Sequence, residues 1–199
     1  MNIFDYLISI FFPQPIEVAI TNISTPSLAP LEPLKKEGTM DLSVLDPKDI
    51  AKVKLLYPRI QENAYKFLLD VRNSGFNGGI FMSYRTFAEQ DALYAQGRTK
   101  PGQIVTNAKG GWSYHNYGIA FDFVFKTAQG NWTWNSTQWE AVAKLGIKNG
   151  WEWGGSWMTF PDRPHMQMVF NQQEITLLKL YQKKNSLADV WQYLDNLPT

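Results

Sequence analysis

The chain contains no cysteine and only two histidines, His115 and His165, among its 199 residues. The absence of cysteine excludes disulfides, thiolate metal sites and a thiol nucleophile. It says little about the cellular compartment, because a chain without cysteine is stable in oxidising and reducing surroundings alike. Any transition-metal site must therefore use nitrogen and oxygen ligands.

The chain also lacks an excess of charge of one sign, since it has 19 basic and 18 acidic residues and a formal net charge of +1. No basic run suited to neutralising phosphates is present, so we expect no nucleic-acid partner. Hydrophobic residues make up 44% and charged residues 19%, which is typical of one globular domain, and we expect a monomer. The aromatic content of 15%, with eight tryptophans, fits an aromatic core or a groove for sugars or peptides.

Long hydrophobic runs are also lacking. The apolar stretch from Ile3 to Phe12 is interrupted by Asp5 and is too short to span a bilayer. It lacks the basic start and the small-residue cleavage site of a secretory signal. Two interpretations stay open for residues 3–12: contact with a membrane surface, or a tail that is docked on the domain or loose.

Proline is concentrated near the start, since five of the eleven prolines fall between Pro13 and Pro33. Such a composition predicts an extended linker. We therefore expect an N-terminal apolar segment and linker over residues 1–39, a folded domain over residues 40–171 and a helical extension over residues 172–199.

Patterning within the domain mixes helices and strands without the regular alternation of a parallel sheet. Asp46 followed by Pro47 predicts a helix start, and Thr137 with Glu140 has capping-box spacing for a later helix. The fold class expected is α+β, with a small antiparallel sheet flanked by helices. Strands are predicted over residues 80–84, 119–125 and 165–170, and helices over 47–57, 58–73, 86–97, 139–150 and twice after residue 172.

Alternation along two of these strands separates their polar residues from the core. In the segment 119–125 the odd-numbered residues are isoleucine and phenylalanine, so Asp122 lies on the opposite face. In the segment 165–170 the same rule places His165 and Gln167 opposite Met166. Asp122 and His165 are therefore expected on one face of the sheet, directed away from the aromatic core.

His115 lies just before its strand, and Gly118 lets the chain turn back over the sheet. Two imidazoles and one carboxylate around an open position form the arrangement of a catalytic zinc site. Manganese and nickel accept the same ligands. The alternative is that both histidines are ordinary structural groups, but Asp122 in an apolar strand needs a partner.

Two further residues are candidates for the chemistry. Asp162 lies three residues before His165, between prolines that forbid a helix, so a tight turn would bring its carboxylate beside the metal as a general acid/base. An aspartate that caps this turn is an equally good interpretation. Arg85, just past a strand end, is suited to a substrate carboxylate or an oxyanion, or to an ordinary salt bridge.

The motif Ser113-x-His115-x-x-Gly118-x-Ala120-x-Asp122 resembles the signature of the D-Ala-D-Ala metallopeptidase family of zinc enzymes, which is related to the hedgehog domain. The wider pattern "SYR…EQ…LYAQGRTKPGQIVTNAKGGWSYHNYGIAFDF…WEWGGSW…DRPHMQ" is similar to the L-alanyl-D-glutamate endopeptidase branch, which includes bacterial cell-wall hydrolases and phage endolysins. The similarity runs from about residue 80 to residue 167. Ser156 and Met166 depart from this branch, where an acidic and an aromatic residue are usual, and both are expected near the cleft.

The resemblance implies one zinc ion per chain, a hedgehog-like fold and a site on the face of the sheet. It implies His115, Asp122 and His165 as zinc ligands, and Asp162 as the general acid/base. Arg85 is implied to contact the substrate or transition state, and Ser113 is a candidate substrate-binding residue.

The implied substrate is the peptidoglycan stem peptide, cut between L-Ala and D-Glu. A D-Ala-D-Ala carboxypeptidase or dipeptidase is the alternative, and a non-catalytic zinc-containing wall-binding module is a third hypothesis. The site of action is then the bacterial cell envelope, or the wall reached by a phage lysin made in the cytoplasm.

Overall fold

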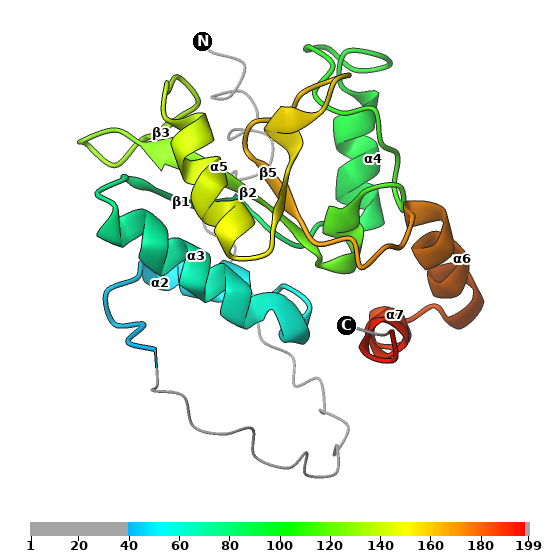
Figure 1. The fold of residues 1–199 in the computed structure, drawn as a ribbon. Coiled ribbons are helices and arrows are strands. Elements are labelled where there is room, and N and C mark those ends of the chain that lie inside the picture. Colours follow the sequence, from blue (N-terminus) through cyan, green and yellow to red (C-terminus); the bar gives the residue numbers. More distant parts are fainter. Residues whose placement is uncertain (1–39, 198–199) are drawn as a thin grey trace.

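The computed structural model describes residues 40–197 (Figure 1). The apolar segment and the linker predicted over residues 1–39 lie outside this range, and so does the membrane contact considered for residues 3–12. Within the described residues, no helix has the length and apolar character needed to cross a bilayer.

The centre of the described chain is a five-stranded sheet in which β1, β2, β5 and β4 lie side by side in that order and β3 pairs with β2. All of these pairings are antiparallel. The predicted α+β class with a small antiparallel sheet is confirmed. The strands are β1 (Gly78–Met82), β2 (Ala120–Lys126), β3 (Trp132–Thr133), β4 (Glu152–Trp153) and β5 (His165–Gln167).

Helices surround this sheet, and most begin where the sequence predicts. Asp46 caps α2 by accepting a hydrogen bond from the Lys48 amide at 2.9 Å, and Thr86 with Glu89 forms a complete capping box for α4. The helices are α2 (Pro47–Val53), α3 (Gln61–Asn73), α4 (Phe87–Ala95), α5 (Trp139–Lys148), α6 (Glu174–Lys184) and α7 (Leu187–Asp195), with 3₁₀ turns η1 (Pro58–Ile60), η2 (Tyr114–Tyr117) and η3 (Gly154–Ser156).

Two local predictions are wrong. The capping box of Thr137 and Glu140 does not form, because α5 begins at Trp139 with Gln138 in the capping position and no side-chain cap. The last strand was expected over residues 165–170 but ends at Gln167. Phe170 and Asn171 have φ of 50° and 54°, a left-handed conformation that turns the chain out of the sheet.

The core lies between the sheet and the pair α3 and α5, which cross the sheet next to each other (Figure 1). As predicted from alternation, Ile119, Phe121, Phe123 and Phe125 are all buried in this core. The ring of Phe67 on α3 packs 5.4 Å from Phe121 and 5.5 Å from Phe123, measured between centroids. The phenylalanine face of β2 therefore holds the two layers together and leaves the opposite face for the site.

The C-terminal helices pack against the same core. Leu177 on α6 and Val190 and Leu194 on α7 are fully buried members of it. Trp191 donates its indole N–H to the carbonyl of Tyr117 at 2.8 Å. Because Tyr117 belongs to η2, helix α7 supports the turn that carries His115.

Candidate metal centre and active site

Asp122 and His165 face each other across the β2–β5 ladder. They are direct register partners, and Asp122 also pairs with Met82 of β1. Neither side chain belongs to the core cluster, whereas the alternate residues Phe121 and Met166 do. The prediction that the two polar residues share the face opposite the core is confirmed.

His115 reaches the same place from η2. Gly118 ends this turn at φ 67°, and a side chain there would press on the backbone of Leu55 and Tyr57 at 3.2 Å. The Gly118 carbonyl accepts a hydrogen bond from the Tyr57 amide at 2.8 Å, which fixes the reversal. The glycine thus sends the chain into β2 with the imidazole of His115 over the sheet.

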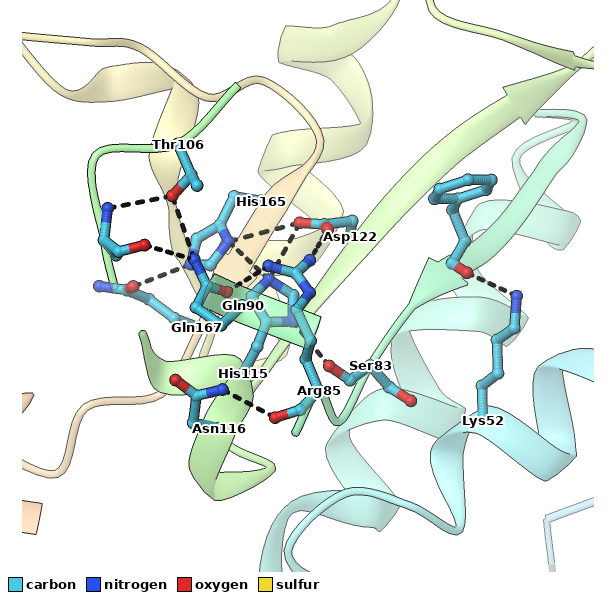
Figure 2. Close-up of polar contacts among 12 residues, drawn as sticks. Lys52, Ser83, Arg85, Gln90, Thr106, His115, Asn116, Asp122, His165 and Gln167 are labelled. Carbon is cyan, nitrogen blue, oxygen red and sulfur yellow. Dashed lines mark hydrogen bonds and ion pairs between the residues drawn. The ribbon is translucent and has the colours of Figure 1, made fainter. Parts of the chain in front are cut away.

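Three donor atoms converge at this point (Figure 2). Nε2 of His115 lies 3.1 Å from Nδ1 of His165 and 3.2 Å from Oδ1 of Asp122, and His165 Nδ1 lies 3.4 Å from the same oxygen. Ligand atoms about 2.0–2.1 Å from a tetrahedral zinc ion are separated by about 3.3 Å. The three distances therefore match one face of a zinc tetrahedron, and these residues can hold a metal ion.

The outer hydrogen bonds decide which ring nitrogens face inward. Nδ1 of His115 donates to the carbonyl of Ser83 at 2.7 Å, since a carbonyl can only accept. Nε2 of His165 donates to Oε1 of Gln167 at 2.9 Å, because the amide nitrogen of Gln167 is used to donate to Glu152 at 3.1 Å. When both imidazoles are neutral, each therefore directs a lone pair toward the other ring and toward Asp122. Two nitrogen lone pairs and one carboxylate oxygen that face one another form a site suited to a cation.

The electrostatics of the cluster also favour a cation. Burial alone would raise the pKa of Asp122, but His115 and His165 outweigh it and hold the pKa well below its usual range. Burial lowers the pKa of His115. Burial would also lower the pKa of His165, but the hydrogen bond and the negative charge of Asp122 outweigh burial and raise this pKa. The buried carboxylate thus attracts positive charge, and a metal ion competes with a proton for this position.

Arg85 is part of a buried network next to the three donors. Its Nη1 donates to Oε1 of Gln90 at 2.7 Å, and its Nη2 lies 3.4 Å from Oδ2 of Asp122. Gln90 in turn donates to the carbonyl of Ala108 at 2.8 Å, and Asn116 donates to the carbonyl of Arg85 at 2.7 Å. A surface salt bridge is therefore the wrong description, because the guanidinium is buried and held from two sides (Figure 2).

Asp162 lies in the turn that leads into β5. Its amide donates to the carbonyl of Gly154 at 3.0 Å, and its carbonyl accepts from the His165 amide at 3.2 Å. Within residues 40–197, its carboxylate caps no backbone amide. Burial, together with the charge of Asp122, raises its pKa to about 6. Such a carboxyl group can exchange a proton near neutral pH.

A cavity of about 570 Å³ connects these groups. Its walls include His115, Asp122, His165, Asp162 and Arg85. The predicted substrate contact Ser113 also lines it, as does Trp157, whose ring centroid lies 5.2 Å from that of His165. The six predicted site residues therefore all border one cavity.

The two residues that depart from the family pattern, Ser156 and Met166, do not line the cleft near which they are expected, whereas the core-face position that alternation predicts for Met166 is confirmed. Met166 is buried in the core beside Gly146, and Ser156 turns its hydroxyl to the carbonyl of Trp153 at 2.7 Å. Neither borders the cavity. Trp151 is likewise in the core, with its ring 4.6 Å from that of Phe121.

Sequence reasoning missed most of the supporting partners. Gln167 was placed on the correct face but given no role, although a glutamine two residues after a histidine in a strand is a usable signal. Gln90 carries no such signal, since a single glutamine in a helix is common. The Ser83 carbonyl could not be found at all, because every residue has a backbone carbonyl.

Three comparisons with known proteins show what the chain is similar to. A family model described as D-alanyl-D-alanine carboxypeptidase matches residues 106–168, which include the three donors and Asp162. The chain is 41% identical over 125 residues to the peptidoglycan L-alanyl-D-glutamate endopeptidase CwlK of Bacillus subtilis (strain 168), covering 58% of this chain and 75% of CwlK. The crystal structure of Serratia marcescens L-Ala D-Glu endopeptidase ChiX is 25% identical, with a TM-score of 0.46 over 62% of this chain and 88% of ChiX.

Proposed function

The chain belongs to the peptidase family described as D-alanyl-D-alanine carboxypeptidase, and from this premise we propose that it is a zinc-dependent peptidoglycan peptidase that cuts stem peptides between L-Ala and D-Glu. The observation that carries the proposal is the convergence of His115, Asp122 and His165 at tetrahedral spacing in the wall that also holds Asp162. The name of CwlK supports the choice of bond.

The metal is assigned as zinc because the donors are two imidazoles and one carboxylate, without thiolate. Bound by these three residues, zinc supplies a Lewis acid that activates water and polarises the amide carbonyl. The outer bonds of His115 to Ser83 and of His165 to Gln167 keep both lone pairs directed inward.

Asp162 is assigned as the general base that accepts the proton of the attacking water and then returns it to the leaving nitrogen. Its position in the cavity wall, with no capping role in the described chain, supports this assignment. Arg85 is assigned to stabilise negative charge that develops on the carbonyl oxygen. Arg85 borders the cavity and its Nη2 lies 3.4 Å from Oδ2 of Asp122, so its positive charge is next to the proposed metal ligands.

A D-Ala-D-Ala carboxypeptidase or dipeptidase is a second candidate, favoured by the description of the matching family model. A non-catalytic wall-binding module is less well supported, since a purely structural metal needs no neighbouring carboxyl group such as Asp162. In each case the substrate or ligand is peptidoglycan. The protein would therefore act at the bacterial envelope, as a wall hydrolase of the cell or as a phage lysin.

Digestion of purified peptidoglycan, followed by mass spectrometry of the fragments, tests the proposal. The L-Ala–D-Glu endopeptidase predicts new D-Glu amino termini. Release of D-Ala alone would instead support the carboxypeptidase, and intact wall after prolonged incubation with the zinc-loaded protein would support the binding module.

A further inference from the structure

Arg163 is the exposed cation of the catalytic cavity. Among the described residues that border the cavity, only Arg85 and Arg163 carry a permanent positive charge. Arg85 is buried and engaged by Gln90 and Asp122, whereas Arg163 is exposed. Within residues 40–197, no carboxylate lies at ion-pair distance from the guanidinium of Arg163. Arg163 is therefore available to a ligand.

The backbone of Arg163 is fixed by hydrogen bonds, whereas its side chain is exposed. The Arg163 carbonyl accepts the indole N–H of Trp153 at 2.8 Å, and the next carbonyl, of Pro164, accepts the Phe123 amide at 2.9 Å. Asp162, on the other side, is bonded to Gly154 at 3.0 Å. The turn therefore fixes the Cα of Arg163 directly next to Asp162, the proposed acid/base.

The chemistry of the leaving group provides a partner for this charge. A stem peptide continues through the γ-carboxyl of D-Glu, so the α-carboxylate of D-Glu stays free on the carbon that bears the leaving nitrogen. Asp162 is assigned to deliver a proton to that nitrogen. Arg163 follows Asp162 directly in the chain and lines the same cavity, and its guanidinium matches a carboxylate in charge and in paired donors.

We infer that Arg163 binds the α-carboxylate of the residue that supplies the leaving amine, and that the protein therefore prefers stem peptides with free D-Glu over those amidated to D-isoglutamine. This inference rests on the proposed endopeptidase function. It assigns different roles to the two arginines. Arg85 stabilises negative charge on the carbonyl oxygen, and Arg163 binds the carboxylate of the leaving group. Amidation removes the charge and leaves the size of the group nearly unchanged, which makes it a matched probe.

Two synthetic peptides test the inference: acetyl-L-Ala–D-Glu–L-Lys, joined through the γ-carboxyl, and its D-isoglutamine counterpart. The wild type is expected to cleave the peptide with the free carboxylate with a kcat/KM about 10-fold higher than for the amidated peptide. This factor is the lower end of the effect of a hydrogen bond to a charged group. Arg163→Ala should lower kcat/KM on the first peptide about 10-fold and on the second by clearly less, because the amide carbonyl accepts only a weaker hydrogen bond. Arg163→Lys should keep part of the preference, because it retains the charge without the paired donors.

Arg72→Ala serves as the matched control, because Arg72 is an exposed arginine at the end of α3, away from the cavity, and should change neither rate. Equal cleavage of the two peptides by the wild type would overturn the inference. So would an equal loss on both peptides in Arg163→Ala, which would indicate a structural role. Failure of the wild type to cut either peptide at L-Ala–D-Glu would instead remove the proposed function, and the inference with it.

Discussion

At the scale of single residues, the site depends on which nitrogen each histidine directs toward Asp122. His115 uses Nδ1 for the Ser83 carbonyl and His165 uses Nε2 for Gln167, so opposite nitrogens face the centre in the two rings. Outer bonds of this kind fix the ring orientation and make the inward nitrogen a better metal ligand. With both ring protons used in these outer bonds, the two inward nitrogens, which lie 3.1 Å apart, would offer their lone pairs to a cation.

Asp162→Asn separates chemistry from metal binding. The amide has almost the same shape as the carboxylate but accepts no proton, so we expect a loss of about 10²- to 10⁴-fold in kcat on peptidoglycan fragments. Zinc content, measured by elemental analysis, should stay at one ion per chain because Asp162 is not among the three donors. A variant that remains fully active would show that Asp162 is not the acid/base.

His165→Ala removes one of the three donors and should abolish stoichiometric zinc binding. Gln167→Leu is the graded companion, because it leaves the ring in place but removes the acceptor of its Nε2 proton. We expect zinc affinity about 10- to 100-fold weaker in Gln167→Leu, measured by competition with a chelating dye. Stoichiometric zinc in purified His165→Ala would remove His165 from the ligand set.

At the scale of elements, β2 and β5 do most of the positioning. Their antiparallel register sets Asp122 opposite His165, while the alternate residues of both strands fill the core. One strand pair therefore supplies two donors and also anchors α3 and α5. The third donor depends on the chain reversal at Gly118. Tyr57, in the segment between α2 and η1, and Trp191 of α7 hold this reversal through hydrogen bonds.

Trp191→Phe tests whether α7 supports the turn that carries His115. A smaller aromatic ring replaces the indole, and the buried carbonyl of Tyr117 loses its donor, which costs about 1–3 kcal/mol. For a domain of this size we expect the midpoint of thermal unfolding to fall by several degrees, together with weaker zinc binding. Gln192→Ala, an exposed position on the same helix, is the control and should change neither quantity. If Trp191→Phe loses stability without any change in zinc affinity, α7 supports the core and not the metal turn.

The sequence predicts some of these features better than others. Alternation in the segment 119–125 is sufficient to direct Asp122 away from the phenylalanines, and the scarcity of histidine narrows the ligands. Spacing alone leaves Asp162 undecided between a turn cap and an acid/base, since both require the same short turn. The partners of Arg85 depend on how α4 and the loop before Gly111 fold together, and no short-range pattern encodes that.

Two local misjudgements have a common cause. The cap of α5 and the end of β5 depend on backbone dihedral angles, and the residues involved, Thr137 and Phe170, are compatible with several conformations. Met166 was expected near the cleft because it follows a ligand, yet the alternation that placed His165 correctly also directs Met166 into the core. The family resemblance, and not strand geometry, supplied the substrate.

At the scale of the whole molecule, one sheet separates two tasks. Its phenylalanine face packs on α3 and α5 and provides stability, while the other face borders the cavity with the donors, Asp162 and both arginines. The C-terminal helices, which lie outside the family match at residues 106–168, extend the same core. They therefore belong to the folded unit that positions the site.

The rate of peptidoglycan cleavage before and after removal of the metal is the decisive measurement for zinc-dependent hydrolysis by this protein. The protein is dialysed against a chelator until no metal is detected, assayed, and then assayed again after addition of one equivalent of zinc. A zinc-dependent peptidase should lose all cleavage on chelation and regain it with that single equivalent. Undiminished cleavage by the metal-free protein would show that hydrolysis does not depend on zinc.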